Sequence, residues 1–272
     1  MADLPAVLAP MADWSAVVRP RARIGHTLEV HETIGSTNDR ARELVFEAGG
    51  DGGVVLAELQ TAGRGRRGRT WISPPGLNLT LSVALRPALA VADAWQLGLA
   101  TALATLDACR MASPAAALGL KWPNDVVAGD ERKVAGMLLE TVLTDERLTG
   151  AVLGIGINAN WQPSDMPDEV GDTATSLASL AGADVDRVAL LDRLLDSLDV
   201  ELVAVEAGRS PLARYRAACV TIGREVTVET AAGTVEGTAV GLDARGSLLV
   251  DTPAGQVALS SGEVASVRGS RG

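Results

Sequence analysis

The chain has 272 residues, a mass of 28.0 kDa and a formal net charge of -10, and 47% of its residues are hydrophobic. This length and composition suit one sizeable domain with a buried core plus a smaller domain. Apolar runs stay shorter than the roughly 18 residues of a membrane span, and no basic residue precedes the short apolar stretch 4–10, which argues against a membrane protein and a signal peptide.

The first thirty residues are rich in alanine and proline and show no strong periodicity. Three arginines, Arg19, Arg21 and Arg23, alternate along their second half. We expect residues 1–30 to form at most a lead-in, either partly disordered or packed as an extension.

Residues 35–38, with the sequence Gly-Ser-Thr-Asn, are typical of a helix N-terminus. Hydroxyl and amide side chains can accept hydrogen bonds from the free N–H groups of a first helical turn. Considered alone, the segment favours capping. The functional alternative is that Ser36, Thr37 and Asn38 contact a small polar ligand.

Residues 53–60 predict a strand that leads into an arginine-rich loop, and residues 77–85 predict the strand that leaves it. The loop, residues 63–71, reads GRGRRGRTW and holds four arginines within six residues of an acidic chain. Glycines let a backbone approach a ligand, and guanidinium groups bind phosphate through paired, charge-assisted hydrogen bonds. We therefore expect a mobile phosphate-binding loop that closes over its ligand.

Three other interpretations of this loop fit less well. Its G-x-G-x-x-G spacing is typical of dinucleotide-binding folds, but Pro74 and Pro75 exclude the helix that such a motif needs. A nucleic-acid-binding arm is unexpected in a chain with a pI of about 4.8. A simple solvated charge run is unexpected because residues 61–87 contain no acidic residue.

The remaining pattern alternates between helices and short strands. We expect helices, a turn between two short strands, two longer strands and four terminal strands. The helices are expected at 92–111, 190–207 and 211–219, the turn at 122–125, the longer strands at 132–140 and 148–160, and the terminal strands at 226–228, 237–241, 248–250 and 257–259. Alternating glycines at 154 and 156 leave one strand face bare, so a flat ligand can lie on the backbone. The terminal strands, separated by Gly/Asp turns, predict a small β-barrel.

Metal-ligand and disulfide patterns are weak in this sequence. Cys109 and Cys219 are too few for a disulfide framework, and we expect buried thiols in a reducing, cytoplasmic compartment. His26 and His31 stand alone, so we expect them to be solvent-exposed and predict no zinc site.

Five segments, taken in order, resemble the biotin–protein ligases over residues 33–267. They are GSTN at 35–38, QTAGRGRRGR at 60–69, KWPND at 121–125, RKVAG at 132–136 and GIGIN at 154–158. The resemblance implies an α+β fold: a mixed β-sheet flanked by helices, of the class II synthetase-like type, followed by a small SH3-like β-barrel. The implied domains are a lead-in (1–30), a catalytic domain (31–220) and the barrel (221–268).

The resemblance also implies a two-step reaction. Biotin and ATP give biotinyl-5'-adenylate and pyrophosphate, and a lysine of a biotin carboxyl carrier protein then displaces AMP. A carboxylate must approach a polyanion in the first step, so the site needs cations where negative charge gathers. The arginine loop and two lysines supply them.

By position in the matching motifs, the implied site falls into four sets. The catalytic set is Lys133, Arg64 and Lys121. The biotin-binding set is Ser36, Thr37, Asn38, Gln60, Gly63, Arg64, Gly65, Arg66, Lys133, Gly136, Gly154 and Gly156. The ATP-binding set is Arg64, Arg66, Arg69, Trp71, Lys121, Asn124, Lys133 and Asn158. Asp125 is the expected carboxylate ligand of Mg²⁺, which binds few protein groups and keeps phosphate and water oxygens.

Within this set, Arg64 is expected to hold the biotin carboxylate and the adenylate phosphate, and Lys133 to lie between carboxylate and α-phosphate. Trp71 is expected to cover the adenine. Only 35 residues precede Ser36, too few for a winged helix-turn-helix domain, so we expect the monofunctional form, a monomer or weak homodimer that binds neither DNA nor membrane.

Two alternatives stay open. One is a DNA-binding regulator that uses biotinyl-AMP as corepressor. The other is a lipoate or octanoyl transferase, against which the arginine-glycine loop favours biotin.

Overall fold

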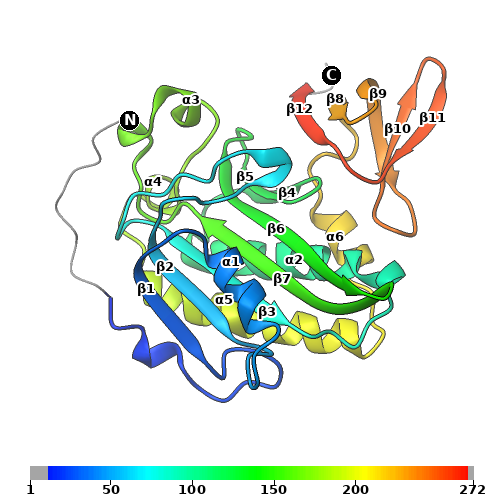
Figure 1. The fold of residues 1–272 in the computed structure, drawn as a ribbon. Helices are drawn as coiled ribbons and strands as arrows, with labels where there is room; N and C mark the ends of the chain where they lie inside the picture. The colour runs from blue at the N-terminus through cyan, green and yellow to red at the C-terminus, as the bar shows by residue number, and fades with distance from the viewer. Residues whose placement is uncertain (1–11, 269–272) are drawn as a thin grey trace.

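The computed structural model describes residues 12–268 of the chain, which form a large mixed sheet with helices and a smaller sheet at the C-terminal end (Figure 1). The large sheet has the strand order β1-β2-β3-β7-β6-β5-β4. Its strands are β1 (Leu28–Ile34), β2 (Val54–Gln60), β3 (Leu79–Leu85), β4 (Leu118–Lys121), β5 (Asp125–Ala128), β6 (Lys133–Thr144) and β7 (Arg147–Ile157). Only β1 and β2 pair in parallel, and the other neighbours are antiparallel.

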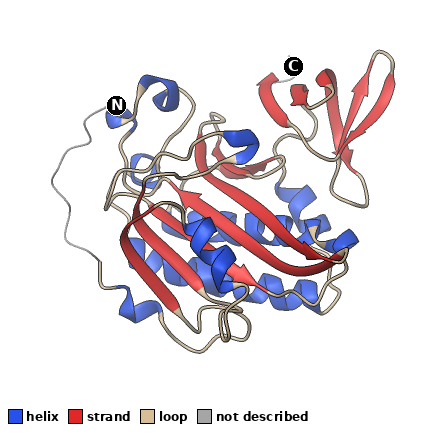
Figure 2. Cartoon of the chain, viewed as in Figure 1, coloured by secondary structure: helices blue, strands red, loops and turns tan. Residues whose placement is uncertain are grey.

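Helices cover both faces of this sheet (Figure 2). The α-helices are α1 (Thr37–Leu44), α2 (Trp95–Ala112), α3 (Asp168–Gly171), α4 (Leu177–Ala181), α5 (Arg187–Glu206) and α6 (Leu212–Ala218). The 3-10 turns are η1 (Trp14–Val17), η2 (Arg66–Gly68), η3 (Val91–Asp93) and η4 (Pro163–Asp165). Among the described residues, none of the helices combines the length and apolar character needed to cross a membrane.

Successive side chains of a strand point to opposite faces of the sheet, so the position of a residue along the strand determines which helices it packs against. Leu81, Val83 and Leu153 belong to the main core beneath α2 and α5. Ala84 and Val152, one residue out of step, pack with Ala41, Leu44 and Val45 around α1 instead. The face that α1 covers only in part is therefore left for polar side chains and glycines.

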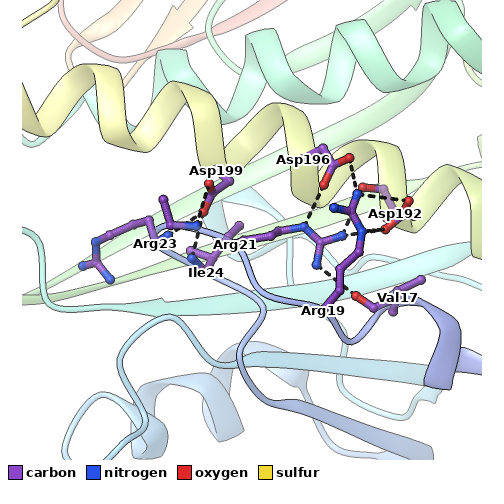
Figure 3. Close-up of polar contacts among 9 residues, drawn as sticks. Val17, Arg19, Arg21, Arg23, Ile24, Asp192, Asp196 and Asp199 are labelled. Carbon is purple, nitrogen blue, oxygen red and sulfur yellow. Dashed lines mark hydrogen bonds and ion pairs between the residues drawn. The ribbon is translucent and has the colours of Figure 1, made fainter.

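The N-terminal segment is attached to α5 by a ladder of charged contacts (Figure 3). The Arg21 guanidinium, whose side chain is 2% exposed, contacts Asp192 at 2.6 Å and Asp196 at 2.8 Å, and Arg19 pairs with the same two carboxylates. Backbone N–H groups of residues 22–24 donate to the Asp199 carboxylate at 2.6 to 3.1 Å. Residues 12–27 are thus a packed extension, and residues 1–11 of the expected lead-in lie outside the described part.

In addition to these charged contacts, Trp14 attaches the N-terminal segment to the end of β2. Its indole Nε1 donates to Glu58 Oε1 at 3.2 Å, and Glu58 forms a buried ion pair with Arg187 at 2.7 Å. The Arg187 guanidinium lies 5.3 Å from the Trp14 ring, a distance at which cation–π attraction operates. We name residues 12–27 the N-terminal strap.

The smaller sheet begins at Glu225 and lies beyond α6 (Figure 1). Its strands are β8 (Glu225–Thr230), β9 (Gly233–Leu242), β10 (Leu248–Thr252), β11 (Gly255–Leu259) and β12 (Glu263–Arg268), in the order β11-β10-β9-β8-β12. All its pairings are antiparallel. The expected class, a mixed sheet flanked by helices and followed by a small β unit, is confirmed; closure of that unit into a barrel stays a prediction.

Candidate active site

A cavity of about 550 Å³ opens between the arginine loop, the start of α1, and strands β5, β6 and β7. Glu263 and Val264 of the smaller sheet close one side of it. The predicted strands on both sides of the loop are β2 and β3, which pair with each other and give the loop a rigid base. The cavity therefore collects residues from both ends of the chain.

Nearly every predicted site residue lines this cavity. They are Ser36, Thr37, Asn38, Gln60, Arg64, Gly65, Arg66, Arg69, Trp71, Lys121, Asn124, Asp125, Lys133, Gly136, Gly154, Gly156 and Asn158. Gly63 is the exception: it is buried at the base of the loop, where its carbonyl accepts the Trp71 N–H at 3.0 Å. A Cβ there would meet the Trp71 carbonyl oxygen at 2.4 Å, so glycine is needed to close the loop.

One end of the cavity is a chain of hydrogen-bonded polar side chains. The Thr37 N–H and hydroxyl donate to Gln60 Oε1 at 2.7 and 3.0 Å. The Ser82 hydroxyl lies 2.7 Å from Thr37 Oγ1 and 2.6 Å from Asn38 Oδ1. Ser82 itself is fully buried, so this end is rigid before any ligand arrives.

The capping interpretation of residues 36–38 is wrong. Ser36 holds the N-cap position of α1, but its side chain makes no capping hydrogen bond. Thr37 and Asn38 direct their side chains across to β2, β3 and β6. The polar side chains of this segment therefore form part of the cavity wall and do not cap the helix.

The glycines of β6 and β7 make room for larger side chains. A Cβ on Gly156 would lie 2.4 Å from the Trp71 indole, and one on Gly136 would lie 2.8 Å from Lys133 Nζ. A Cβ on Gly154 would lie 2.4 Å from Asn38 Oδ1. The bare strand face expected from the alternating glycines is present, and in this structure the Trp71 indole lies on it.

Lys133 belongs to the positively charged part of the cavity lining, which also contains Lys121, Arg66 and Arg69 and which we call the cationic wall. Its Nζ is 2.8 Å from Asp125 Oδ1 and 5.5 Å from the centroid of the Trp71 ring. Asp125 Oδ1 is buried and, among the described residues, has no hydrogen bond of good geometry beyond this ion pair. The carboxylate therefore retains lone pairs for a further cation.

The arginine loop is attached to the smaller sheet. The Arg66 guanidinium donates to Asn124 Oδ1 at 3.1 Å and to the Gly262 carbonyl at 3.0 Å, and burial lowers its pKa from the ordinary value. Arg67 donates to the Glu229 carbonyl at 2.9 Å, and Arg69 pairs with Glu263 at 2.5 Å. Three of the loop's four arginines are therefore held by carboxylate or carbonyl oxygens of the C-terminal unit.

Arg64 lies elsewhere in the site. Its guanidinium pairs with Asp39 at 2.7 Å and lies 3.4 Å from Glu140, next to α1 and the polar end. Arg66, two residues on, is the loop arginine that is desolvated on the Asp125 side of the cavity. The structure therefore places Arg64 and Arg66 in different parts of the cavity, although the sequence motifs assign both of them to biotin binding and to ATP binding.

The chain has only two lysines, Lys121 and Lys133, and both line the cavity. All other basic residues except two histidines are arginines. Arginine stays protonated at any physiological pH, whereas a lysine amine can lose its proton.

Metal-ligand clusters are absent from the described residues: no group of three or more His, Cys, Asp or Glu side chains is placed to hold an ion. The expected exposure of both histidines is half right. His26 is exposed, but His31 is half-buried, because it lies on β1 paired opposite Ala57, and its Nε2 is fully covered. Both cysteines are buried as expected, and burial raises the pKa of the Cys109 thiol to about 12.

Sequence reasoning missed Ser82 and Glu140, and assigned no role to Glu263. Ser82 and Thr80 are the polar positions of a strand that is otherwise apolar, and they share the face that points to α1 and the cavity. Glu140 is an isolated acid at the end of the strand expected at 132–140 and lies within the longer β6. These are weak signals, because a polar residue on a half-covered strand is common.

The chain matches the model of the biotin/lipoate A/B protein ligase family over residues 30–158 and that of the biotin protein ligase C-terminal domain over residues 221–265. It is 39% identical over 247 residues to the biotin–[acetyl-CoA-carboxylase] ligase of Mycobacterium tuberculosis, covering 89% of each chain. It is 33% identical over 243 residues to the bifunctional ligase/repressor BirA of Bacillus subtilis, covering 89% of this chain and 74% of that protein.

Among solved structures, the biotin protein ligase of Aquifex aeolicus in complex with biotin and ATP superposes with a TM-score of 0.74 and 32% identity. The match covers 89% of this chain and 98% of that one. The chain therefore belongs to the biotin protein ligases.

Proposed function

We propose that the chain is an ATP-dependent ligase that joins biotin to AMP in this cavity and passes the biotinyl group to a lysine of a biotin carboxyl carrier protein. The observation that carries the proposal is the combination of a rigid polar end, a glycine-lined slot and a cationic wall within one cavity. The relative solved with biotin and ATP supports both substrates.

In the first step, a biotin carboxylate oxygen attacks the α-phosphorus of ATP. The new O–P bond forms as the bond to the β-phosphate breaks, and pyrophosphate leaves. Both reactants are anionic, so cations that lie where charge concentrates lower the barrier. We assign this task to Lys133 and Arg66, with Lys121 in support. All three line the cavity: Lys133 pairs with Asp125, Lys121 lies opposite Asp125 in the sheet, and Arg66 contacts the adjacent Asn124.

Arg69 is assigned to the outer phosphates of ATP. Its present partner Glu263 is a carboxylate, and a phosphate offers the same guanidinium a stronger pair of acceptors. We assign Arg64 to the α1 side of the biotin pocket, because Asp39 and Glu140 already hold its guanidinium there. Trp71, Asn124 and Asn158 are assigned to the nucleotide side.

In the second step, the carrier lysine attacks the acyl carbon of the mixed anhydride. The C–N bond forms, the acyl C–O bond breaks, AMP leaves with the electron pair of that bond, and the amine nitrogen gives up a proton to solvent. No nucleophilic side chain of the ligase is needed, because the anhydride already activates the acyl group.

The ureido ring of biotin is assigned to the polar end. Ser36, Thr37, Asn38 and Gln60 supply donors and acceptors there, and a buried polar group without a partner would cost about 1–3 kcal/mol. The Ser82 hydroxyl, whose one hydrogen can go to Thr37 Oγ1 or to Asn38 Oδ1, helps to keep these groups oriented. Gly154 leaves the space in which the Asn38 amide lies, and Gly156 the space in which the Trp71 indole lies.

Mg²⁺ fits the residues present. Asp125 offers a buried carboxylate oxygen whose hydrogen bonding is incomplete, and a single protein carboxylate is what Mg²⁺ uses when substrate phosphates supply the other oxygens. Bound there, the ion would neutralise phosphate charge. The role of Asp125 beyond this is to hold Lys133 Nζ in the cavity.

We further propose a cytoplasmic enzyme that acts as a monomer or weak homodimer, without DNA or membrane partners. Dependence on ATP favours the cytoplasm. All residues assigned to the site come from one chain, and a net charge of -10 does not favour binding to DNA.

The test is incubation of the purified protein with biotin, Mg-ATP and a carrier domain, followed by mass measurement. The carrier should gain one biotinyl group, and pyrophosphate should be released even without carrier. Lipoate offered in competition should not replace biotin. Failure to form pyrophosphate and acyl-AMP from biotin would overturn the proposed function.

A further inference from the structure

Glu140 lies on β6, and its carboxylate contacts two other elements, α1 and the arginine loop. Oε2 accepts the Asn38 Nδ2–H at 2.7 Å and lies 3.4 Å from the Arg64 guanidinium of the arginine loop. Oε1 pairs with Arg42 of α1 at 3.3 Å. Arg64 is also held by Asp39 at 2.7 Å. One carboxylate thus connects the start of α1 with the arginine loop.

The contact with Glu140 decides how the Asn38 amide is turned. A carboxylate only accepts hydrogen bonds, so the NH₂ group of Asn38 must face Glu140. The carbonyl oxygen then faces Ser82, whose hydroxyl lies 2.6 Å away. Gly154 leaves the space for that oxygen, because a Cβ there would lie 2.4 Å from it. Asn38 is therefore clamped from two sides.

The clamp is buried at Asn38 and half-exposed at Glu140. Asn38 and Ser82 are 5% and 0% exposed, and the Glu140 side chain is 23% exposed. A buried amide that loses one of its partners is destabilised, whereas an exposed ion pair contributes little by itself. The importance of Glu140 therefore lies in orienting Asn38 and in sharing that same oxygen with Arg64.

We propose that Glu140 is a positioning residue that couples the ureido-binding end of the cavity to docking of the arginine loop. The inference rests on the proposed function, because it takes biotin as the ligand at Asn38. A ligand that fixes Asn38 also fixes Glu140, and Glu140 then offers Arg64 a stationary partner. By thermodynamic reciprocity, a docked loop also favours the ligand.

Glu140→Gln separates the two halves of this coupling. The Gln carbonyl can still accept from Asn38, but the charge that attracts Arg64 is gone. We expect the biotin KM to rise about three- to tenfold, with kcat for pyrophosphate release at saturating biotin unchanged. Biotin-dependent protection of the loop from trypsin should fall to less than about half of the wild-type effect.

Ser82→Ala removes the other side of the clamp and leaves the loop contact intact. Its biotin KM should rise by a similar factor, while saturating biotin should still protect the loop. Arg64→Gln removes one cleavage site, so protection is compared at Arg67 and Arg69; there it should reproduce the loss, and combining it with Glu140→Gln should add nothing further. Glu43→Gln is the matched control: Glu43 is an exposed carboxylate of α1 that pairs with Arg40 and lies outside the site.

The outcomes are distinct. A Glu140→Gln protein that matches Glu43→Gln in both biotin KM and protection overturns the inference and leaves the proposed function standing. A fall in kcat with an unchanged biotin KM also overturns it, because the residue then acts on the chemistry. A wild-type protein that binds no biotin overturns the proposed function and the inference together.

Discussion

At the scale of single residues, the amine of Lys133 is held in place from two sides. Its amine is held by Asp125 on one side and faces the Trp71 ring on the other, and glycine at position 136 leaves the space it occupies. A lysine fixed in this way presents its charge without reorganising at the moment of reaction.

Lys133→Ala should slow adenylate formation by about 10²- to 10³-fold, because one preorganised cation is removed from the reacting phosphate. Biotin affinity should stay within about tenfold of wild type, since the polar end is untouched. Pyrophosphate release and equilibrium biotin binding measure the two effects separately. An unimpaired rate of pyrophosphate release would remove Lys133 from its assigned role.

At the scale of elements, the arginine loop links the catalytic sheet to the C-terminal unit. Arg66 and Arg67 donate to carbonyls of that unit, and Arg69 pairs with Glu263. Each contact is made to oxygen, so an incoming polyphosphate competes with it directly.

Limited trypsin digestion should test closure of this loop. In the free protein, cleavage should follow Arg64, Arg67 and Arg69, whose side chains are 40%, 41% and 58% exposed, more readily than half-buried Arg66. Biotin plus Mg-ATP should slow cleavage severalfold by ordering the loop. Equal cleavage with and without ligands would contradict a closing loop.

The regular elements were predictable because their hydrophobic period is local. The strand expected at 53–60 is β2 at Val54–Gln60, and the helix expected at 190–207 is α5 at Arg187–Glu206. β1 was missed because it is an edge strand whose side chains are only half-covered. The resemblance of five motifs to a known family, rather than periodicity, supplied the residues that line the cavity.

What sequence could not supply is any role that depends on a distant partner. Arg19 and Arg21 read as charges in a loose lead-in, since the carboxylates that hold them come about 170 residues later in the chain. Ser82 and Glu140 can be assigned a role only in the folded structure, where both contact Asn38. Separations of this size leave no pattern within a single sequence window.

At the scale of the whole molecule, the N-terminal strap ties α5 to the end of β2. The Arg19 guanidinium holds the pKa of Asp192 below its ordinary value of 3.8. A carboxyl whose pKa is lowered by folding stabilises the native state above its unfolded pKa and loses that contribution as pH falls through the folded one. The strap should therefore hold firmly at neutral pH and weaken only in acid.

Asp192→Asn should lower the melting temperature by a constant amount above pH about 5, and the difference from wild type should shrink below pH 3.8. Melting curves from pH 3 to 7 measure this. Asp184→Asn, at an exposed carboxylate with no ion pair among the described residues, is the control and should show no such trend. A pH-independent difference for Asp192→Asn would assign its effect to packing.

Placing both lysines on the cavity wall has a consequence for the protein's own integrity. A mixed anhydride of a carboxylic acid and AMP acylates amines that it meets, and the cavity in which we propose it forms is lined by the two lysines of the chain. Outside the cavity the sequence offers no further lysine: apart from the N-terminal α-amine and two histidines, its other basic groups are guanidiniums, which do not take up the acyl group at neutral pH. Reagent that leaves the cavity thus finds no lysine side chain on the rest of the chain to label.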